Sequence, residues 1–490
     1  MRWNRIAPSL GALAVAAGLC GCAAVGPNFK RPAAPTDAGY AMAGDQGAAS
    51  QHGGLGAEVA QDWWSAFHSP ELDRAMRQAL ADNPDLQAAD ATLLAARAEL
   101  SAAHGARLPQ ADLNAGIERE RFNFATFGFD ASAFPGIQNN PELSIYSLGA
   151  SVGYALDVFG GLRRNEEAAG ARAEAQAHRL DAAYLTLTGE VATQAAIIAA
   201  TRAEIATVQQ IIAADRRNIE LVRSAQRAGG VAEEARVNAQ SQVDADSALL
   251  PPLEQQLATA RHALALLVGK APADYAAPDF DLEALPLPAD VPVSLPSELV
   301  RQRPDILQAE ADLHAATAMV GVQTAKLYPS LNLSAALTQS ALEPGQVFDW
   351  PATAYTLAGG LTAPAFHGGQ LKAQKRAAER QAEAAAATYR STVLHAFGQV
   401  ADQMQALAHD EAELAADQRT AHSAAETLKL ETLAYQEGGQ GLLPVVDAQR
   451  QVNAAQLKIV QARARRYVDT IRLFVATGRG WRGGDKVASR

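Results

Sequence analysis

The feature that most constrains this chain is an internal duplication. The stretch "NPDLQAADATLL", which begins at Asn83, recurs as "RPDILQAEADLH" from Arg303. Further along the spacing between the copies is shorter, and "RAGGVAEEARVNAQ" from Arg227 recurs as "QEGGQGLLPVVDAQ" from Gln436. Self-similarity of this kind, with one register before the change of spacing and a second after it, predicts two equivalent structural repeats.

The duplication divides the chain into segments. We expect a first repeat and a second repeat, here called repeat 1 and repeat 2, joined by a linker rich in proline and aspartate. A loose tether is expected before repeat 1. The predicted boundaries are 1–21 for a signal peptide, 22–69 for a lipidated tether, 70–269 for repeat 1, 270–295 for the linker, 296–478 for repeat 2 and 479–490 for a C-terminal tail.

Each repeat shows the same order of patterns. A helix is expected first, near 70–107 and 297–327, and a proline follows it. Two segments with period-two alternation come next, which predicts strands within 111–118, 148–159, 331–337 and 355–363. Aromatic residues sit in the loops between them, at Phe127, Phe129, Phe134, Phe348 and Trp350. The alternation fits a membrane strand with an aromatic belt as well as it fits a half-buried hairpin of a soluble protein.

Long proline-free stretches follow the strands. Residues 161–227 predict one helix, which would be about 100 Å long at 1.5 Å per residue. The glycine pair Gly229 and Gly230 is expected to end it, and a helix over 232–268 would then run back alongside. Repeat 2 repeats the pattern around Gly438 and Gly439. The two turns therefore predict the far ends of two equivalent helical hairpins.

The N-terminus reads as an export leader. Two arginines precede the short apolar run "IAPSLGALAVAAGL", which is too short for a permanent membrane helix. The run ends in "LCGC", a bacterial lipobox pattern that predicts cleavage before Cys22 and lipidation of that residue. The alternative is an ordinary signal peptide cut at a small-residue site. Ala23 after the cysteine favours sorting to the outer membrane, by resemblance to bacterial lipoproteins.

Composition excludes several classes of function. The net charge of −11 argues against nucleic acid. The mature chain holds one cysteine, so it can form neither an internal disulfide nor a cysteine metal site. "GASVG" at 149–153 matches a hydrolase motif, but Ser151 lies inside an alternating strand and not at a strand-to-helix turn. We expect no enzyme activity, no cofactor and no metal.

Taken together, these patterns predict a membrane structure whose strands come from several subunits. No segment of the mature chain is apolar enough for a membrane helix, and open strand edges are not tolerated in lipid. Four strands cannot close alone, because bacterial barrels begin at eight. The strands must then be shared between subunits, and the pooled long helices would form a tube that ends in movable hairpins.

The chain resembles the outer-membrane efflux protein family, in the lipoprotein (NodT/OprM-like) branch related to TolC. The resemblance rests on "LCGCAAVGPNFKRP", "GYALDVFGGLRR", "KLYPSLNLSA" and "LLPVVDAQRQVNAAQL", among others, and covers nearly the whole mature chain. It implies a mostly α, α+β fold: a homotrimer with a twelve-stranded transmembrane β-barrel, four strands from each subunit, and a long periplasmic α-barrel. It further implies the exit duct of a tripartite pump, passive and gated, that exports drugs and related toxic compounds.

The resemblance also assigns roles to the turns. A periplasmic adaptor protein, together with a resistance–nodulation–division transporter of the inner membrane, would be the partner, and the adaptor would contact Gly229, Gly230, Val231, Gly438, Gly439 and Leu442. The family's acidic gate position falls on Gln436 here, and the adjacent Glu437 could supply the charge instead. A solvated glutamate is an equally good interpretation of Glu437.

Two other functions stay open at the level of sequence. The same fold serves as the outer-membrane duct of type I protein secretion. A periplasmic coiled-coil scaffold anchored only by lipid would also keep the long helices, but it should lack strands.

Overall fold

The computed structural model of the chain describes residues 24–36, 39–42, 56, 59–121, 123, 141–288 and 291–478. These residues fall into two compact units. The sheet unit comprises the described residues within Met1–Arg31, Leu94–Glu174 and Ala311–Ala387, and the helical unit comprises those within Pro32–Leu93, Ala175–Glu310 and Thr388–Arg490. Each unit therefore draws segments from both sequence repeats.

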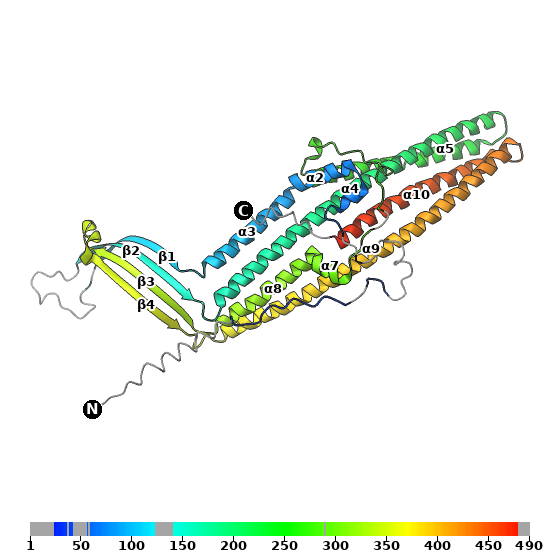
Figure 1. Cartoon of the computed structure of the whole chain (residues 1–490). Helices are drawn as coiled ribbons and strands as arrows, with labels where there is room; N and C mark the ends of the chain where they lie inside the picture. Colours follow the sequence, from blue (N-terminus) through cyan, green and yellow to red (C-terminus); the bar gives the residue numbers. More distant parts are fainter. Residues whose placement is uncertain are drawn as a thin grey trace, which may run out of the picture. The chain divides into compact units, whose positions relative to one another are not determined.

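The sheet unit is built on one antiparallel sheet with the strand order β1-β2-β3-β4 (Figure 1). The central pairing joins the two repeats, because β2 of the first repeat lies beside β3 of the second. The alternating segments thus form strands as predicted, and most of them extend beyond the predicted ranges. Their bounds are β1 Gln110–Arg121, β2 Glu142–Leu156, β3 Ser330–Ala341 and β4 Thr353–Thr362. Two 3₁₀ turns, Pro344–Phe348 and Trp350–Ala352, join β3 to β4.

Each repeat opens with two helices, so the single helices predicted near 70–107 and 297–327 were wrong. The breaks fall at Asn83 and Arg303, whose ψ angles of 122° and 123° are extended. A proline follows each of them, and the proline ring disfavours the helical conformation of the preceding residue. The helices are α2 Pro70–Asp82, α3 Pro84–Gly105, α7 Pro296–Gln302 and α8 Pro304–Ala325.

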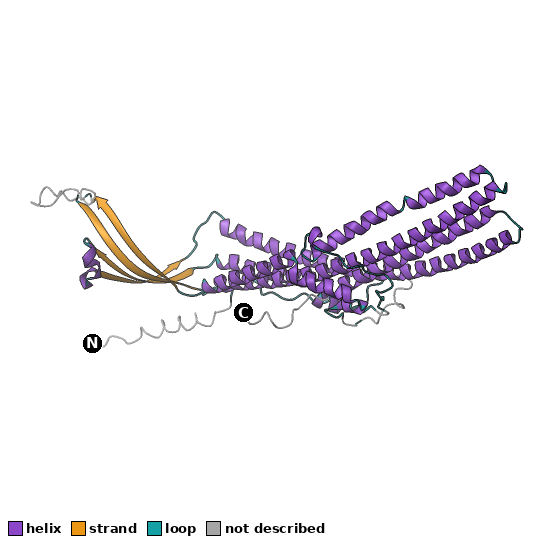
Figure 2. Ribbon diagram, turned by 90° about the horizontal axis from the view of Figure 1, so that it is seen from above, coloured by secondary structure: helices purple, strands orange, loops and turns teal. Residues whose placement is uncertain are grey.

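Long helices dominate the rest of the chain. The two longest, α4 Gly161–Arg227 and α9 Gln370–Gln436, have 67 residues each, or about 100 Å at 1.5 Å per residue. Returning helices run beside them in both views (Figures 1 and 2): α5 Glu233–Ser247, α6 Leu250–Leu267 and α10 Leu442–Thr477. The single helix predicted over 232–268 is two helices, because Pro251 and Pro252 have no N–H to continue the hydrogen-bond ladder.

The core of the helical unit gathers around a short 3₁₀ helix, Trp63–Phe67. Trp63 is 3% exposed and stacks on Phe474 of α10, with ring centroids 5.3 Å apart. The segment predicted as a linker, 270–295, also packs into this core. Phe280 and Val293 are buried, and the Tyr467 hydroxyl donates to the Leu282 carbonyl at 3.0 Å. The expectation of a loose connection was therefore wrong there.

The described part of the N-terminal tether is likewise fixed in place. In the sheet unit, the Val25 N–H donates to the Phe159 carbonyl at 3.0 Å, and Phe29 stacks on His314 at 4.4 Å. In the helical unit, the Tyr40 hydroxyl donates to the Ser294 carbonyl at 2.8 Å. The tether predicted over 22–69 is therefore not loose at 24–36 and 39–42.

Candidate functional site: the sheet face and the helical turns

One face of the sheet is apolar across all four strands. Directly opposed residues point to the same face, and one such row consists of Leu113, Ala150, Leu337 and Tyr355. Nine large apolar side chains on this face are 38% to 85% exposed in the single chain: Leu113, Ile117, Leu148, Val152, Leu333, Leu337, Tyr355, Leu357 and Leu361. A contiguous exposed patch of this kind marks a protein or membrane contact.

The opposite face is mainly small and polar. Its residues include Asp112, Asn114, Ser151, Ser334 and Thr356, each adjacent in sequence to a residue of the apolar face. Within the sheet, β1 and β4 are the outer strands, and each has one edge without a paired strand. The sheet thus has two different faces and two open edges.

Aromatic residues flank the loop end of β3 and β4. Phe348 and Trp350 are 75% and 84% exposed, and both belong to the 3₁₀ turns between these strands. Their position at the strand ends fits the predicted aromatic belt. The corresponding residues of the first repeat, Phe127, Phe129 and Phe134, lie outside the described residues, as do Cys22 and the leader 1–21.

The two glycine turns have the same geometry. Gly229 and Gly438 have φ angles of 76° and 73°, which L-residues with a side chain rarely adopt. Gly230 and Gly439 donate backbone hydrogen bonds to residues five positions earlier, at 2.8 and 2.9 Å. Both long helices therefore end in the same glycine-dependent way, which is a common helix C-terminus.

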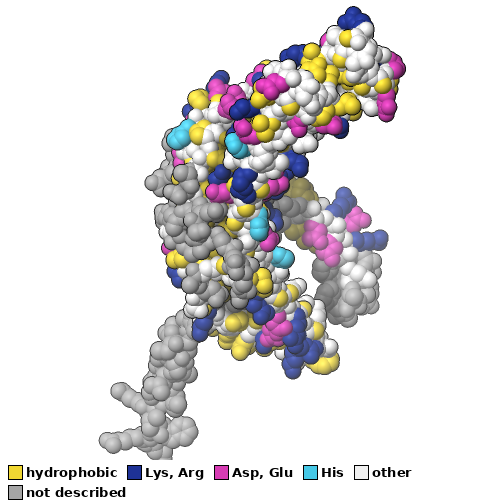
Figure 3. Space-filling model, turned by 90° about the vertical axis from the view of Figure 1, so that its right-hand side faces the viewer, with side chains coloured by type: hydrophobic (Ala, Val, Ile, Leu, Met, Phe, Trp, Pro, Cys, Tyr) yellow, Lys and Arg dark blue, Asp and Glu magenta, His cyan; other side chains and the backbone are white. Residues whose placement is uncertain are grey.

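The other predicted tip residues differ in their exposure. Gln436 is the last residue of α9, and Gln436 and Glu437 are exposed. Leu442, by contrast, is 4% exposed and packs in a small core with Ile219, Val222 and two alanines of α5. This burial does not fit the predicted adaptor contact for Leu442. On the face seen in Figure 3, acidic, basic and hydrophobic side chains are interspersed over the helices.

Two pairs of carboxylates face one another across the hairpins, and the sequence reading missed them. Asp215 on α4 contacts Asp246 on α5, and Asp410 on α9 contacts Asp469 on α10. Burial, reinforced by the neighbouring carboxylate, raises the pKa of Asp215 to about 7 and that of Asp410 to about 6. Asp215 and Asp410 therefore each keep a proton to a higher pH than an isolated aspartate does.

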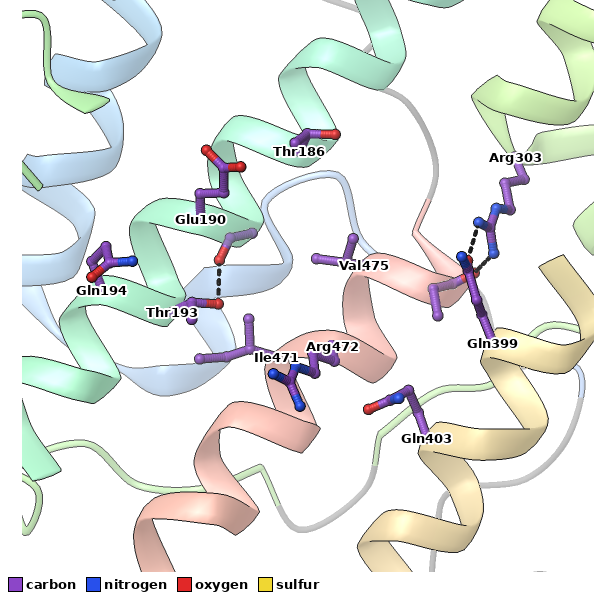
Figure 4. Close-up of a pocket in the computed structure, with 12 residues that line it drawn as sticks. Thr186, Glu190, Thr193, Gln194, Arg303, Gln399, Gln403, Ile471, Arg472 and Val475 are labelled. Atoms are coloured by element: carbon purple, nitrogen blue, oxygen red, sulfur yellow. Dashed lines mark hydrogen bonds between the residues drawn. The ribbon is translucent and has the colours of Figure 1, made fainter. Parts of the chain in front are cut away.

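A cavity of about 370 Å³ lies where α4, α9 and α10 meet (Figure 4). Some of its polar walls are paired, whereas the Gln403 Oε1 atom is buried without a hydrogen-bond partner among the described residues. Arg303 donates to the Ala476 carbonyl at 3.0 Å and to Gln399, and the Thr193 hydroxyl donates to the Gly189 carbonyl at 2.7 Å. We assign the cavity to helix packing.

The sequence motifs for chemistry find no support in the geometry. Ser151 lies within β2, opposite Asp112 and Ala336, so the strand-to-helix turn of a hydrolase nucleophile is not formed. Within the described residues, no three histidine, cysteine or acidic side chains are grouped to hold a metal ion. None of the helices in the described ranges combines the length and hydropathy of a membrane span.

Comparison with known proteins identifies the family to which this architecture belongs. The sequence model of the outer membrane efflux protein family matches residues 75–270 and 295–479. The chain belongs to that family. It is 31% identical to the pyoverdine export outer membrane protein OpmQ of Pseudomonas aeruginosa, over 91% of this chain and 93% of that protein.

Other relatives agree with this assignment. The toluene efflux pump outer membrane protein TtgF of Pseudomonas putida is 28% identical, over 98% of this chain and 97% of that protein. Among solved structures, the outer-membrane channel OprN has a TM-score of 0.83 and 27% identity, over 93% of this chain and 99% of OprN. The fold is therefore that of an outer-membrane efflux channel.

Proposed function

We propose that the chain is the exit duct of a tripartite efflux pump and works as a lipid-anchored homotrimer. The observation that carries this proposal is the sheet with one exposed apolar face and two open edges. An open edge cannot face hydrocarbon, so the sheets of several chains must join edge to edge. Three chains supply twelve strands, and membership of the family favours three chains over two.

The position of Ala24, the first described residue, is compatible with lipidation of Cys22. Ala24 lies directly against Gly160, four residues after the end of β2: a Cβ added to Gly160 would be 2.4 Å from the Ala24 Cβ. Cys22 is two residues before Ala24, and two residues span at most about 7 Å. A lipid on Cys22 would therefore insert beside the end of the sheet, where the apolar face also begins.

The glycine turns are the proposed contact for the periplasmic adaptor, and through it for a resistance–nodulation–division transporter. Gly229, Gly230, Gly438 and Gly439 are exposed, and Val231 is partly buried. Gln436 and Glu437, next to the second turn, are the proposed gate residues. The cargo is the class of small toxic compounds, which cross the duct passively. Curated relatives carry names for pyoverdine export and for toluene efflux.

The adaptor contact is tested with two substitutions in one turn. Gly438→Leu forces a side chain onto a residue with φ of 73°. Gly441→Leu is the matched control, because Gly441 has an extended backbone with φ of −78° and open space around it. We expect Gly438→Leu to lower drug resistance while the trimer stays intact, and Gly441→Leu to retain resistance. Full resistance in the Gly438→Leu strain would refute the contact.

The duct itself is tested by the mass of the detergent-extracted particle, with Cys22→Ser beside the wild type. A three-chain particle in both supports shared strands as the membrane anchor. A single chain released into the soluble fraction by Cys22→Ser would favour the lipid-anchored scaffold instead. Lost protein secretion with unchanged drug resistance in a deletion strain would favour the type I secretion duct.

A further inference from the structure

A short segment near the N-terminus is bound closely by the sheet unit. Residues 24–29, here called the N-terminal segment, contact the turn between β2 and α4 and contact α8. The Val25 N–H donates to the Phe159 carbonyl of that turn at 3.0 Å. Gly26 has a φ of 92°, and a Cβ added to it would be 2.5 Å from the Gly321 Cα of α8. The backbone of the segment therefore fits against both elements and leaves no room for a side chain at Gly26.

Arg164 of α4 binds this segment through hydrogen bonds. The residue is 4% exposed. Its Nε donates to the Val25 carbonyl at 3.2 Å, and its Nη2 donates to the Ala24 carbonyl at 3.5 Å and to Asn28 Oδ1 at 2.5 Å. Its Nη1 donates to Glu167 Oε2 at 2.7 Å. A guanidinium serves several acceptors at once because its donors form a planar fork. One buried cation thus contacts three residues of the segment.

Two further side chains complete the binding site. Oε1 of Glu167, the partner of Arg164, lies 3.0 Å from Nε2 of His314 on α8. The His314 ring stacks on Phe29 of the segment, with ring centroids 4.4 Å apart. If the segment left, Arg164 would lose its acceptors on the segment and keep the bond to Glu167. Because removing the partners of a buried charge is costly, the fold favours the bound segment.

The bound segment limits the distance between the sheet and a lipid on Cys22. Ala24 lies against Gly160, just after β2, and two residues reach at most about 7 Å. A tether held only at Tyr40, whose hydroxyl donates to the Ser294 carbonyl at 2.8 Å, would be fixed 18 positions after Cys22. Such a tether reaches about 60 Å. Binding of the segment therefore shortens the free tether from about 60 Å to about 7 Å.

We propose that Arg164 is a positioning residue for the lipid of Cys22: by binding the N-terminal segment it holds the lipid next to the end of β2 and so speeds assembly of the trimer in the membrane. The inference rests on the proposed lipid anchor and names the residue that couples this anchor to the sheet. A tether of about 60 Å lets the sheet occupy a layer at the membrane surface roughly nine times thicker than a tether of about 7 Å does. The effective concentration of the sheet at the membrane falls in proportion, so loss of the Arg164 contacts should slow trimer formation roughly tenfold.

Four chains test whether Arg164 acts through the lipid. Arg164→Met keeps a long apolar stem and removes every donor. The appearance of trimer in the outer-membrane fraction is followed after pulse labelling in the wild type, Arg164→Met, Cys22→Ser and the double variant. The Cys22→Ser chains carry a leader with an ordinary small-residue cleavage site, so that they lose the leader but gain no lipid. We expect Arg164→Met to slow trimer formation roughly tenfold in lipidated chains and to change it little in chains without lipid, because substitutions that act on the same step are not additive.

A second variant releases the segment without touching Arg164. In Gly26→Ala the new Cβ collides with Gly321, so the segment must leave its site. Gly39→Ala is the matched control, because open space surrounds Gly39. Gly26→Ala should slow trimer formation as much as Arg164→Met does, and Gly39→Ala should match the wild type. Trypsin cleavage after the exposed Lys30 reports release of the segment directly and should be faster in Gly26→Ala only.

The outcomes separate this inference from the proposed function. Equal slowing by Arg164→Met with and without lipid would show a purely structural role and overturn the inference, and so would a wild-type rate in lipidated Arg164→Met. If Arg164→Met does not fold, the same comparison with Gly26→Ala decides. A three-chain particle whose Cys22 carries lipid by mass leaves the proposed function standing in each of these cases. A wild-type chain without lipid on Cys22 would overturn both the lipid anchor and the role of Arg164.

Discussion

Replacing Leu357 by arginine tests whether the apolar face of the sheet contacts lipid, or instead contacts protein or water. Leu357 is the fifth of ten residues in β4, and its side chain is 76% exposed on the apolar face. In an isolated chain the arginine would meet solvent and cost little. At the middle of a membrane sheet it costs about 2–4 kcal/mol. A trimer holds three copies, so the cost to the assembled particle is roughly 6–12 kcal/mol.

Thr356→Arg is the matched control. Thr356 precedes Leu357 on the same strand, is also exposed, and lies on the polar face opposite Ala336. We expect trimer in the outer-membrane fraction to fall at least about tenfold for Leu357→Arg, since each 1.4 kcal/mol is a factor of about ten. Thr356→Arg should remain near the wild-type amount. Equal amounts of the two variants would show that the apolar face does not meet lipid.

Two further predictions concern the helical unit. The pKa of Asp215 is raised to about 7 by burial and by Asp246, so the folded chain binds a proton that the unfolded chain has released above about pH 4. The stability that this group contributes is full below about pH 4 and is lost progressively as the pH rises to about 7. The melting temperature of Asp215→Asn should therefore depend less on pH over this range than that of the wild type. If circular dichroism melts show the same pH dependence for both, Asp215 is not the source of it. Trp63→Ala should lower the free energy of unfolding by about 3–5 kcal/mol, because Trp63 is 3% exposed. Trp350→Ala should change it by less than about 0.5 kcal/mol, because Trp350 is 84% exposed. Similar denaturation midpoints for the two variants would contradict the described core.

The sequence predicted the elements whose physics is local. Absence of proline predicts α4 with the bounds observed, and alternation predicts four strands with one apolar face. The breaks at Pro84 and Pro304 were missed, although the rule for the residue before a proline applies at both. The pairing of β2 with β3 could not be predicted, because strand alternation says nothing about which strand lies next to which.

The carboxylate pairs show what counting along each hairpin could have found. Asp215 precedes the first glycine turn by nearly the same length of chain as Asp246 follows it, and Asp410 and Asp469 are placed in the same way about the second turn. In an antiparallel hairpin, residues equally far from the turn face one another. Such a count gives which residues face one another, but it does not give the burial that raises the pKa of Asp215 and Asp410.

The sheet of the single chain has a consequence for its synthesis and transit. Before several chains assemble, β1 and β4 each present a row of unpaired backbone groups, and the apolar face of the sheet is exposed to water. Such edges are templates for mispairing and aggregation. If the chain assembles as the proposed homotrimer, a newly exported chain needs a chaperone in transit, and its rate of assembly depends steeply on the concentration of free chains.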